Sequence, residues 1–204
     1  MPLRVDRPEC PGNVRLVSEL VSDARNLAEV HLATALPRRW RHVNGVARQG
    51  TRIASAFGVE ADTLVAACWL HDIGYAPPLA STGFHPLDGA TFLRDHGWDE
   101  RLCALVAHHS CAIREARLRG LENELLTFED ENSPLRDALW FCDMTTDPDG
   151  DLVNVEQRLS EILSRYGEGS IVYDFIHAAR DDLLAAVKRT ETRMVRGSAD
   201  VGLG

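Results

Sequence analysis

The segment from residue 61 to 72 combines helical hydrophobic spacing with two potential metal ligands at its end. Leu64 and Cys68 precede His71 at positions i, i+4 and i+7, so His71 continues the apolar face of a predicted helix. Asp72 follows directly. Burial of one unpaired polar group costs on the order of several kcal/mol. A helix that carries His71 into a core therefore predicts that partners for it come from elsewhere in the chain.

The same helical pattern covers most of the chain, and no segment alternates apolar and polar residues over the length of a strand. With 204 residues, the chain suits one domain with a buried core. We expect an all-α domain over residues 13–190, with flexible tails at 1–12 and 191–204. The predicted helices lie near 14–35, 39–57, 61–72, 87–96, 99–109, 134–145, 154–166 and 170–190.

Composition excludes several classes of function. A formal net charge of −9 disfavours a broad nucleic-acid-binding surface or an anionic membrane surface as partner. The five cysteines show no CxxC spacing, which argues against a disulfide framework or a zinc–cysteine site. No apolar run approaches 18 residues and no signal-peptide core is present. We therefore expect a cytoplasmic protein, and an oligomer stays open.

Three further predicted helices carry a histidine or aspartate on the apolar side. His42 shares a face with Val46. His109 ends the apolar stripe of its own helix, and Asp143 lies one turn after Leu139. Four predicted helices thus place a histidine or aspartate on the apolar side. Burial of these side chains is favourable only if they share a cation or pair with one another.

These residue types restrict the metal. Imidazole and carboxylate ligands without thiolate favour iron or manganese, with nickel, cobalt or zinc as alternatives, and disfavour calcium. The four ligands predicted for one ion are His42, His71, Asp72 and Asp143. The three predicted for a second ion are His85, His108 and His109, with Asp72 bridging the two. His85 could instead cap the following helix, and one of the adjacent histidines could bind only substrate.

These residues resemble the HD-domain superfamily of metal-dependent phosphohydrolases. His42, His71–Asp72 and Asp143 match its H…HD…D signature, and 71–74 reproduces the HDIG form. Residues 85–90 and 107–110 look like the extra histidine motifs of the binuclear subset. The resemblance covers about 38–146, roughly half the chain. It implies an HD-type helical bundle with metals in a central cleft, here with extra N- and C-terminal helices.

Two departures limit what the resemblance implies. The lysine that often follows HDIG is Tyr75 here, and the GYP-type motif of the cyclic-di-GMP enzymes is absent. We therefore do not expect cyclic-di-GMP hydrolysis.

The preferred hypothesis is hydrolysis of a phosphate ester or anhydride in a small nucleotide-like substrate. Asp72 would be the bridging carboxylate that positions the attacking water, while Arg114 and Arg158 would bind phosphate. Segment 110–133 is predicted as a short helix plus a loop over the site, or as a solvated excursion. Two other hypotheses remain: an HD-fold di-iron oxygenase, and a non-catalytic metal-bearing module that senses a nucleotide.

Overall fold

The structure, a computed structural model, describes residues 18–201, and this part of the chain is all-α with no strand. The expected fold class is therefore confirmed. The elements are α1 (Glu19–Leu32), α2 (Pro37–Ile53), α3 (Ala61–Leu70), α4 (His85–Asp95), α5 (Glu100–Ala107), α6 (Ala112–Arg119), α7 (Glu122–Leu125), α8 (Pro134–Met144), α9 (Val155–Tyr166) and α10 (Ile171–Val201), with 3-10 turns at Ala54–Glu60, Ile73–Tyr75 and His109–Cys111.

Polar caps and glycines set several of the boundaries that the sequence predicts. The Asp99 carboxylate accepts a hydrogen bond from the backbone N–H of Leu102 at the start of α5. Asn154 and Gln157 form a reciprocal capping box at the start of α9. Gly167 ends α9 with a φ of 72°, a conformation that suits glycine.

The last helix is longer than predicted. We expected it over 170–190 with a tail from 191, whereas α10 continues to Val201. No proline occurs between 171 and 201, and Gly197 alone does not end the helix. The predicted tail at 1–12 and the first residues of the predicted helix 14–35 lie outside the described part of the chain.

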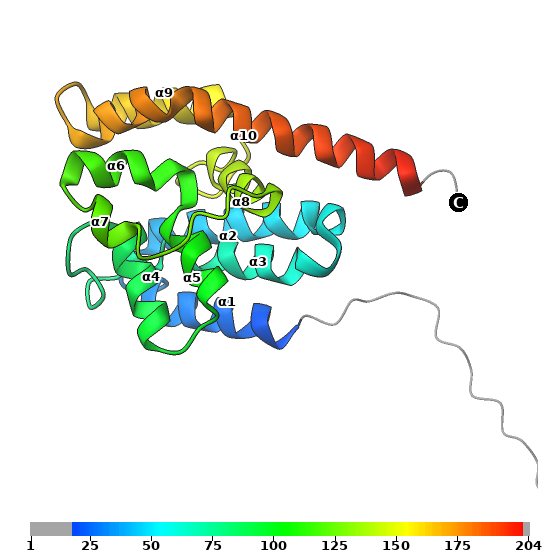
Figure 1. The fold of residues 1–204 in the computed structure, drawn as a ribbon, viewed down its shortest axis with the longest axis horizontal. Coiled ribbons are helices and arrows are strands. Elements are labelled where there is room, and N and C mark those ends of the chain that lie inside the picture. The colour runs from blue at the N-terminus through cyan, green and yellow to red at the C-terminus, as the bar shows by residue number, and fades with distance from the viewer. Residues whose placement is uncertain (1–17, 202–204) are drawn as a thin grey trace, which may run out of the picture.

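The helices form a bundle with α2 and α3 in its interior (Figure 1). Helix α3 contacts α1, α2 and α8, while α4 packs on α5. Helices α9 and α10 lie together along one side of the bundle, where α10 contacts α6 and α8. Most of the buried apolar residues belong to one continuous core.

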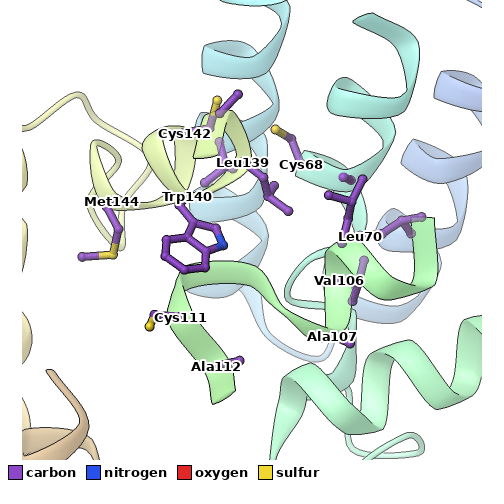
Figure 2. Packing of buried hydrophobic residues seen from close by; sticks show 14 of the residues in the cluster. Cys68, Leu70, Val106, Ala107, Cys111, Ala112, Leu139, Trp140, Cys142 and Met144 are labelled. Atoms are coloured by element: carbon purple, nitrogen blue, oxygen red, sulfur yellow. The ribbon is translucent and has the colours of Figure 1, made fainter. Parts of the chain in front are cut away.

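The core joins the helix ends that carry the candidate ligands. Figure 2 shows Leu70 of α3, Val106 of α5 and Leu139 of α8 in one apolar cluster, and each is at most 1% exposed. His71, His109 and Asp143 follow these residues by one to four positions. Packing of three helices therefore brings their polar ends to a common point.

One stretch of the fold has the length and composition of a membrane span, from Pro37 to Tyr75. It contains α2 and α3, which are separated by a non-helical residue, Gly58. The two helices pack against each other, and much of the stretch is buried inside the fold. These are the properties of core helices in a soluble protein.

Candidate metal centre

The first two candidate ligands lie where α3 ends. His71 is the C-terminal cap residue of α3, and both His71 and Asp72 are buried. The Nδ1–H of His71 donates to the carbonyl oxygen of Cys68 at 2.9 Å. A carbonyl can only accept, so Nδ1 holds the proton and Nε2 points away from the helix.

Two further histidines are held in the same way. The Nδ1–H of His42 donates to the carbonyl oxygen of Asp147 at 2.9 Å. The Nδ1–H of His109 donates to the carbonyl oxygen of Val106 at 2.6 Å. Backbone carbonyls that fix Nδ1–H and leave Nε2 available are the usual second partners of metal-binding histidines.

The Nε2 atoms of His42 and His71 face the carboxylates of Asp72 and Asp143. His42 Nε2 lies 3.0 Å from Asp143 Oδ1 and 3.7 Å from Asp72 Oδ2. His71 Nε2 lies 3.3 Å from Asp72 Oδ2 and 4.0 Å from Asp143 Oδ1, yet it forms no hydrogen bond. Neutral imidazole nitrogens and carboxylate oxygens are both electron donors, so this group requires protons or a cation between them.

A second group lies on the other side of Asp72. Its Oδ1 atom lies 3.3 Å from His85 Nε2 and 3.9 Å from His109 Nε2. The two imidazole Nε2 atoms are 3.1 Å apart. The two oxygens of one carboxylate thus face two separate sets of ligand atoms.

The charges at Asp72 and His71 depend on each other. Burial alone would raise the pKa of the Asp72 carboxyl, but the Arg39 guanidinium and His71 hold it well below its usual range. Burial likewise favours neutral His71, but the Asp72 carboxylate raises the pKa of His71 to about 9. Asp72 is therefore ionised at neutral pH, and the Arg39 guanidinium and protonated His71 balance its charge when no metal is bound.

The pKa values of Asp143 and His109 are both lowered. Burial would raise the pKa of Asp143, but a hydrogen bond with His42 and the charge of His71 hold it below its usual range. Burial and the neighbouring His85 and His71 lower the pKa of His109 to about 3. A neutral imidazole and an ionised carboxylate are the forms that bind metal ions.

The residues fit a metal centre. His42, His71 and Asp72 could hold one ion, and Asp72, His85 and His109 could hold another. The orphaned His71 Nε2 and the facing donor atoms support this assignment. Asp143 adjoins the first group through His42 and His71.

Comparison with known families agrees with this geometry. The HD domain family matches residues 39–139, about half of the chain. The chain belongs to the HD-domain superfamily. No curated protein and no solved structure matches it. HD domains are generally metal-dependent hydrolases, and the matched region contains every candidate ligand except Asp143.

His108 lies outside the metal centre of this HD-domain protein, which corrects its prediction as a ligand. Its Nε2–H donates to the carbonyl oxygen of Phe128 at 2.9 Å, and its own carbonyl accepts from the Trp140 indole. Adjacent residues at a helix end project in different directions, so only His109 reaches the centre. His108 instead fastens segment 110–133 to the core.

The two predicted phosphate-binding arginines differ in position. Arg114 pairs with Asp182 of α10, with Nη2 at 2.6 Å from the carboxylate, and lies away from the centre, so its prediction is corrected. Arg158 is buried and lines the cavity next to the centre. Its positive charge contributes to the low pKa of Asp143.

Sequence reasoning missed Arg39, which donates from Nη1 to Asp72 Oδ2 at 2.6 Å. Its guanidinium carbon lies 3.9 Å from the centre of the Tyr75 ring, and that ring stacks on the His85 imidazole, with ring centres 3.9 Å apart. Tyr75, noted only as a departure from the family lysine, thus lies between an arginine and a candidate ligand. One sequence feature could have indicated Arg39. It stands at the start of the predicted helix 39–57, three residues before the candidate ligand His42, and so one turn away from it.

Ser110 was also missed. Its hydroxyl donates to Asp143 Oδ2, which leaves Asp143 Oδ1 for His42. Ser110 and Cys111 have φ values of 46° and 62°, a left-handed conformation that costs energy in residues other than glycine. This turn joins the candidate ligand His109 to α6, and no sequence pattern indicates it.

Gly74 of the HDIG sequence allows α4 to approach the centre. A β-carbon at this position would lie 2.1 Å from the carbonyl oxygen of His85 and 2.5 Å from the backbone nitrogen of Gly89. Both contacts are with backbone, which cannot rotate aside. The glycine therefore permits the close packing that brings His85 to Asp72.

A cavity of about 260 Å³ opens onto the centre. Asp72, His85, His109 and Asp143 line it. Segment 110–133 contributes Ser110, Ala112, Glu115 and Arg119 to its lining, which fits the expectation of a short helix over the site. Helices α9 and α10 also contribute to its lining.

Proposed function

We propose that this protein is a metal-dependent phosphohydrolase that acts on a phosphate ester or anhydride of a small, nucleotide-like substrate. The observation that carries the proposal is the position of Asp72, which lines a cavity and whose oxygens face two candidate ligand groups. A shared carboxylate between two such groups is the arrangement that binuclear phosphoryl-transfer sites use. We also propose that the site is of the HDIG type and holds two metal ions.

Divalent ions bound there would lower the pKa of a water molecule and neutralise charge on the phosphoryl oxygens. Asp72 would hold both ligand groups in place, so that ions bound there could activate a water molecule. Ser110 keeps Asp143 turned toward His42. We propose iron or manganese as the native metal, because histidine and carboxylate ligands without thiolate suit them.

Arginines beside the centre would bind the phosphate. Arg39 and Arg158 both line the cavity next to Asp72 and Asp143. Arg158 donates from Nη1 to Glu161 at 2.7 Å, and its buried Nε has no partner. A guanidinium with a free N–H matches a phosphate oxygen.

A phosphate-release screen tests the proposal. Purified protein loaded with Mn²⁺ or Fe²⁺ should release phosphate from at least one nucleotide or small phosphate ester. Asp72→Asn should lose metal and activity together, because the shared carboxylate is lost. Oxygen uptake without phosphate release would instead favour an oxygenase. Tight nucleotide binding without turnover under any divalent metal would favour the non-catalytic alternative.

A further inference from the structure

The cavity beside the metal centre has an apolar side that metal and phosphate binding leave unused. Ile162 of α9 and Val172, Phe175 and Ile176 of α10 line it. We call these four residues the α9–α10 wall. Ile162, Phe175 and Ile176 are at most 8% exposed, and Val172 is partly exposed. The wall is therefore a fixed part of the core that also faces the cavity.

The wall and the candidate metal centre line the same cavity. Arg158 and Ile162 are one helical turn apart on α9, so they project from the same face of that helix. The guanidinium of Arg158 lies near Asp143, whereas Ile162 joins the apolar residues of α10. A ligand that places an anionic group at the metal would extend its remaining atoms along this wall.

Size restricts the ligand further. About 260 Å³ is slightly below the range of roughly 300–1,000 Å³ that is usual for sites of drug-sized molecules. The wall also lies outside residues 39–139, the region that matches the HD domain family. Its apolar character is therefore a property of this chain rather than of the matched region.

We propose that the nucleotide-like substrate is a compact phosphate ester that seats an uncharged, apolar face of its organic part on the α9–α10 wall. This inference rests on the proposed function, since the metal centre would hold the phosphate. Burial of an apolar group yields about 25 cal/mol per Å² of surface removed from water. A charged or strongly hydrated group placed directly on the wall gains nothing from these four apolar side chains.

Two phosphonates that cannot be hydrolysed test the inference by calorimetry on the metal-loaded protein. Phenylphosphonate and methylphosphonate share the anionic group and differ in the apolar part. We expect phenylphosphonate to bind at least about tenfold more tightly. The Val172→Asn variant places a polar amide in the wall and should reduce this preference to about threefold or less.

Ile171→Asn is the matched control. Ile171 precedes Val172 on α10, is 40% exposed and lies outside the cavity lining, so its variant should keep the wild-type preference. Val172→Ala shortens the side chain without adding a polar group. It replaces Val172→Asn in the test if the asparagine variant does not fold. It should weaken phenylphosphonate binding and leave methylphosphonate binding unchanged.

The outcomes separate this inference from the proposed function. Equal affinity for the two phosphonates in the wild type, or a full preference in both Val172 variants, would overturn the inference. A preference of the expected kind without phosphate release from any substrate would support the apolar wall and contradict the hydrolase. Failure of both phosphonates to bind the metal-loaded protein would contradict both.

Discussion

Asp72 is the residue on which the centre depends, because its two oxygens belong to different ligand groups. Oδ2 lies near His71 and His42, and Oδ1 lies near His85 and His109. The sequence predicts this shared role, since His71–Asp72 ends an apolar helical stripe and later histidines supply the second group. It does not predict Arg39 on Asp72 or Ser110 on Asp143, because those contacts depend on how separate elements meet in space.

Substitutions of the adjacent histidines His108 and His109 test which of them binds metal. His109→Gln should lower the bound metal from two ions to about one per chain, because the second ligand group loses an imidazole. His108→Gln should keep the wild-type metal content, since an amide N–H can still donate to the Phe128 carbonyl oxygen. Elemental analysis of the two purified variants measures both. Equal losses of bound metal in the two variants would contradict the assignment of His109, and not His108, as the ligand.

The raised pKa of His71 predicts a pH dependence of metal binding. With a folded-state pKa of about 9, His71 is protonated at pH 7, so a metal ion must displace that proton. Asp72 and Asp143 are already ionised and release none. Metal affinity should therefore rise about tenfold per pH unit from 7 to 9. Calorimetric affinities that stay constant over this range would contradict the prediction.

At the level of elements, the contact between the 3-10 turn at Ile73–Tyr75 and α4 decides whether a second ligand group exists. His85 reaches Asp72 because α4 packs directly against Gly74. The helices themselves are largely predictable from periodicity and caps, as the boundaries of α3, α5 and α8 show. The Ser110–Cys111 turn is not predictable, since neither residue type favours a positive φ.

Gly74→Ala tests that contact. The added methyl group would overlap the backbone of His85 and Gly89, so the variant should lose about 1–3 kcal/mol of unfolding free energy. It should also bind less metal, because α4 and His85 must shift away from Asp72.

Gly120→Ala is its control in chemical denaturation and metal analysis. Gly120 has a φ of 72° and open space around its α-carbon, so alanine costs only about 1 kcal/mol of backbone strain. Its metal content should match the wild type. A Gly74→Ala variant with normal stability and metal content would show that the close approach is unimportant.

For the whole molecule, α9 and α10 extend the fold beyond the region matched by the HD domain family. They add Leu159, Ile162, Phe175, Ile176 and Leu183 to the same core that holds the ligand-bearing helices. Arg189 of α10 also pairs with the buried Asp137 of α8 at 2.6 Å. These contacts predict one cooperative domain in which the two helices complete the cavity.

Leu183→Ala tests whether the protein unfolds as one cooperative domain. Leu183 is fully buried, so the substitution should cost about 2–5 kcal/mol in a single unfolding transition that also releases the metal. Asp181→Ala, at a side chain that is 98% exposed, should change stability by less than about 0.5 kcal/mol. Two separate transitions in calorimetry, with the metal lost only in the second, would show that α9 and α10 fold independently.

In the proposed function, Asp72 joins two ligand groups into one binuclear centre. Calorimetric titration of the metal-depleted protein with Mn²⁺ tests it most directly, because the stoichiometry is read from the same curve as the affinity. We expect two ions per wild-type chain and loss of tight binding of both ions in Asp72→Asn. A single ion per wild-type chain, or two ions retained after Asp72→Asn, would contradict it.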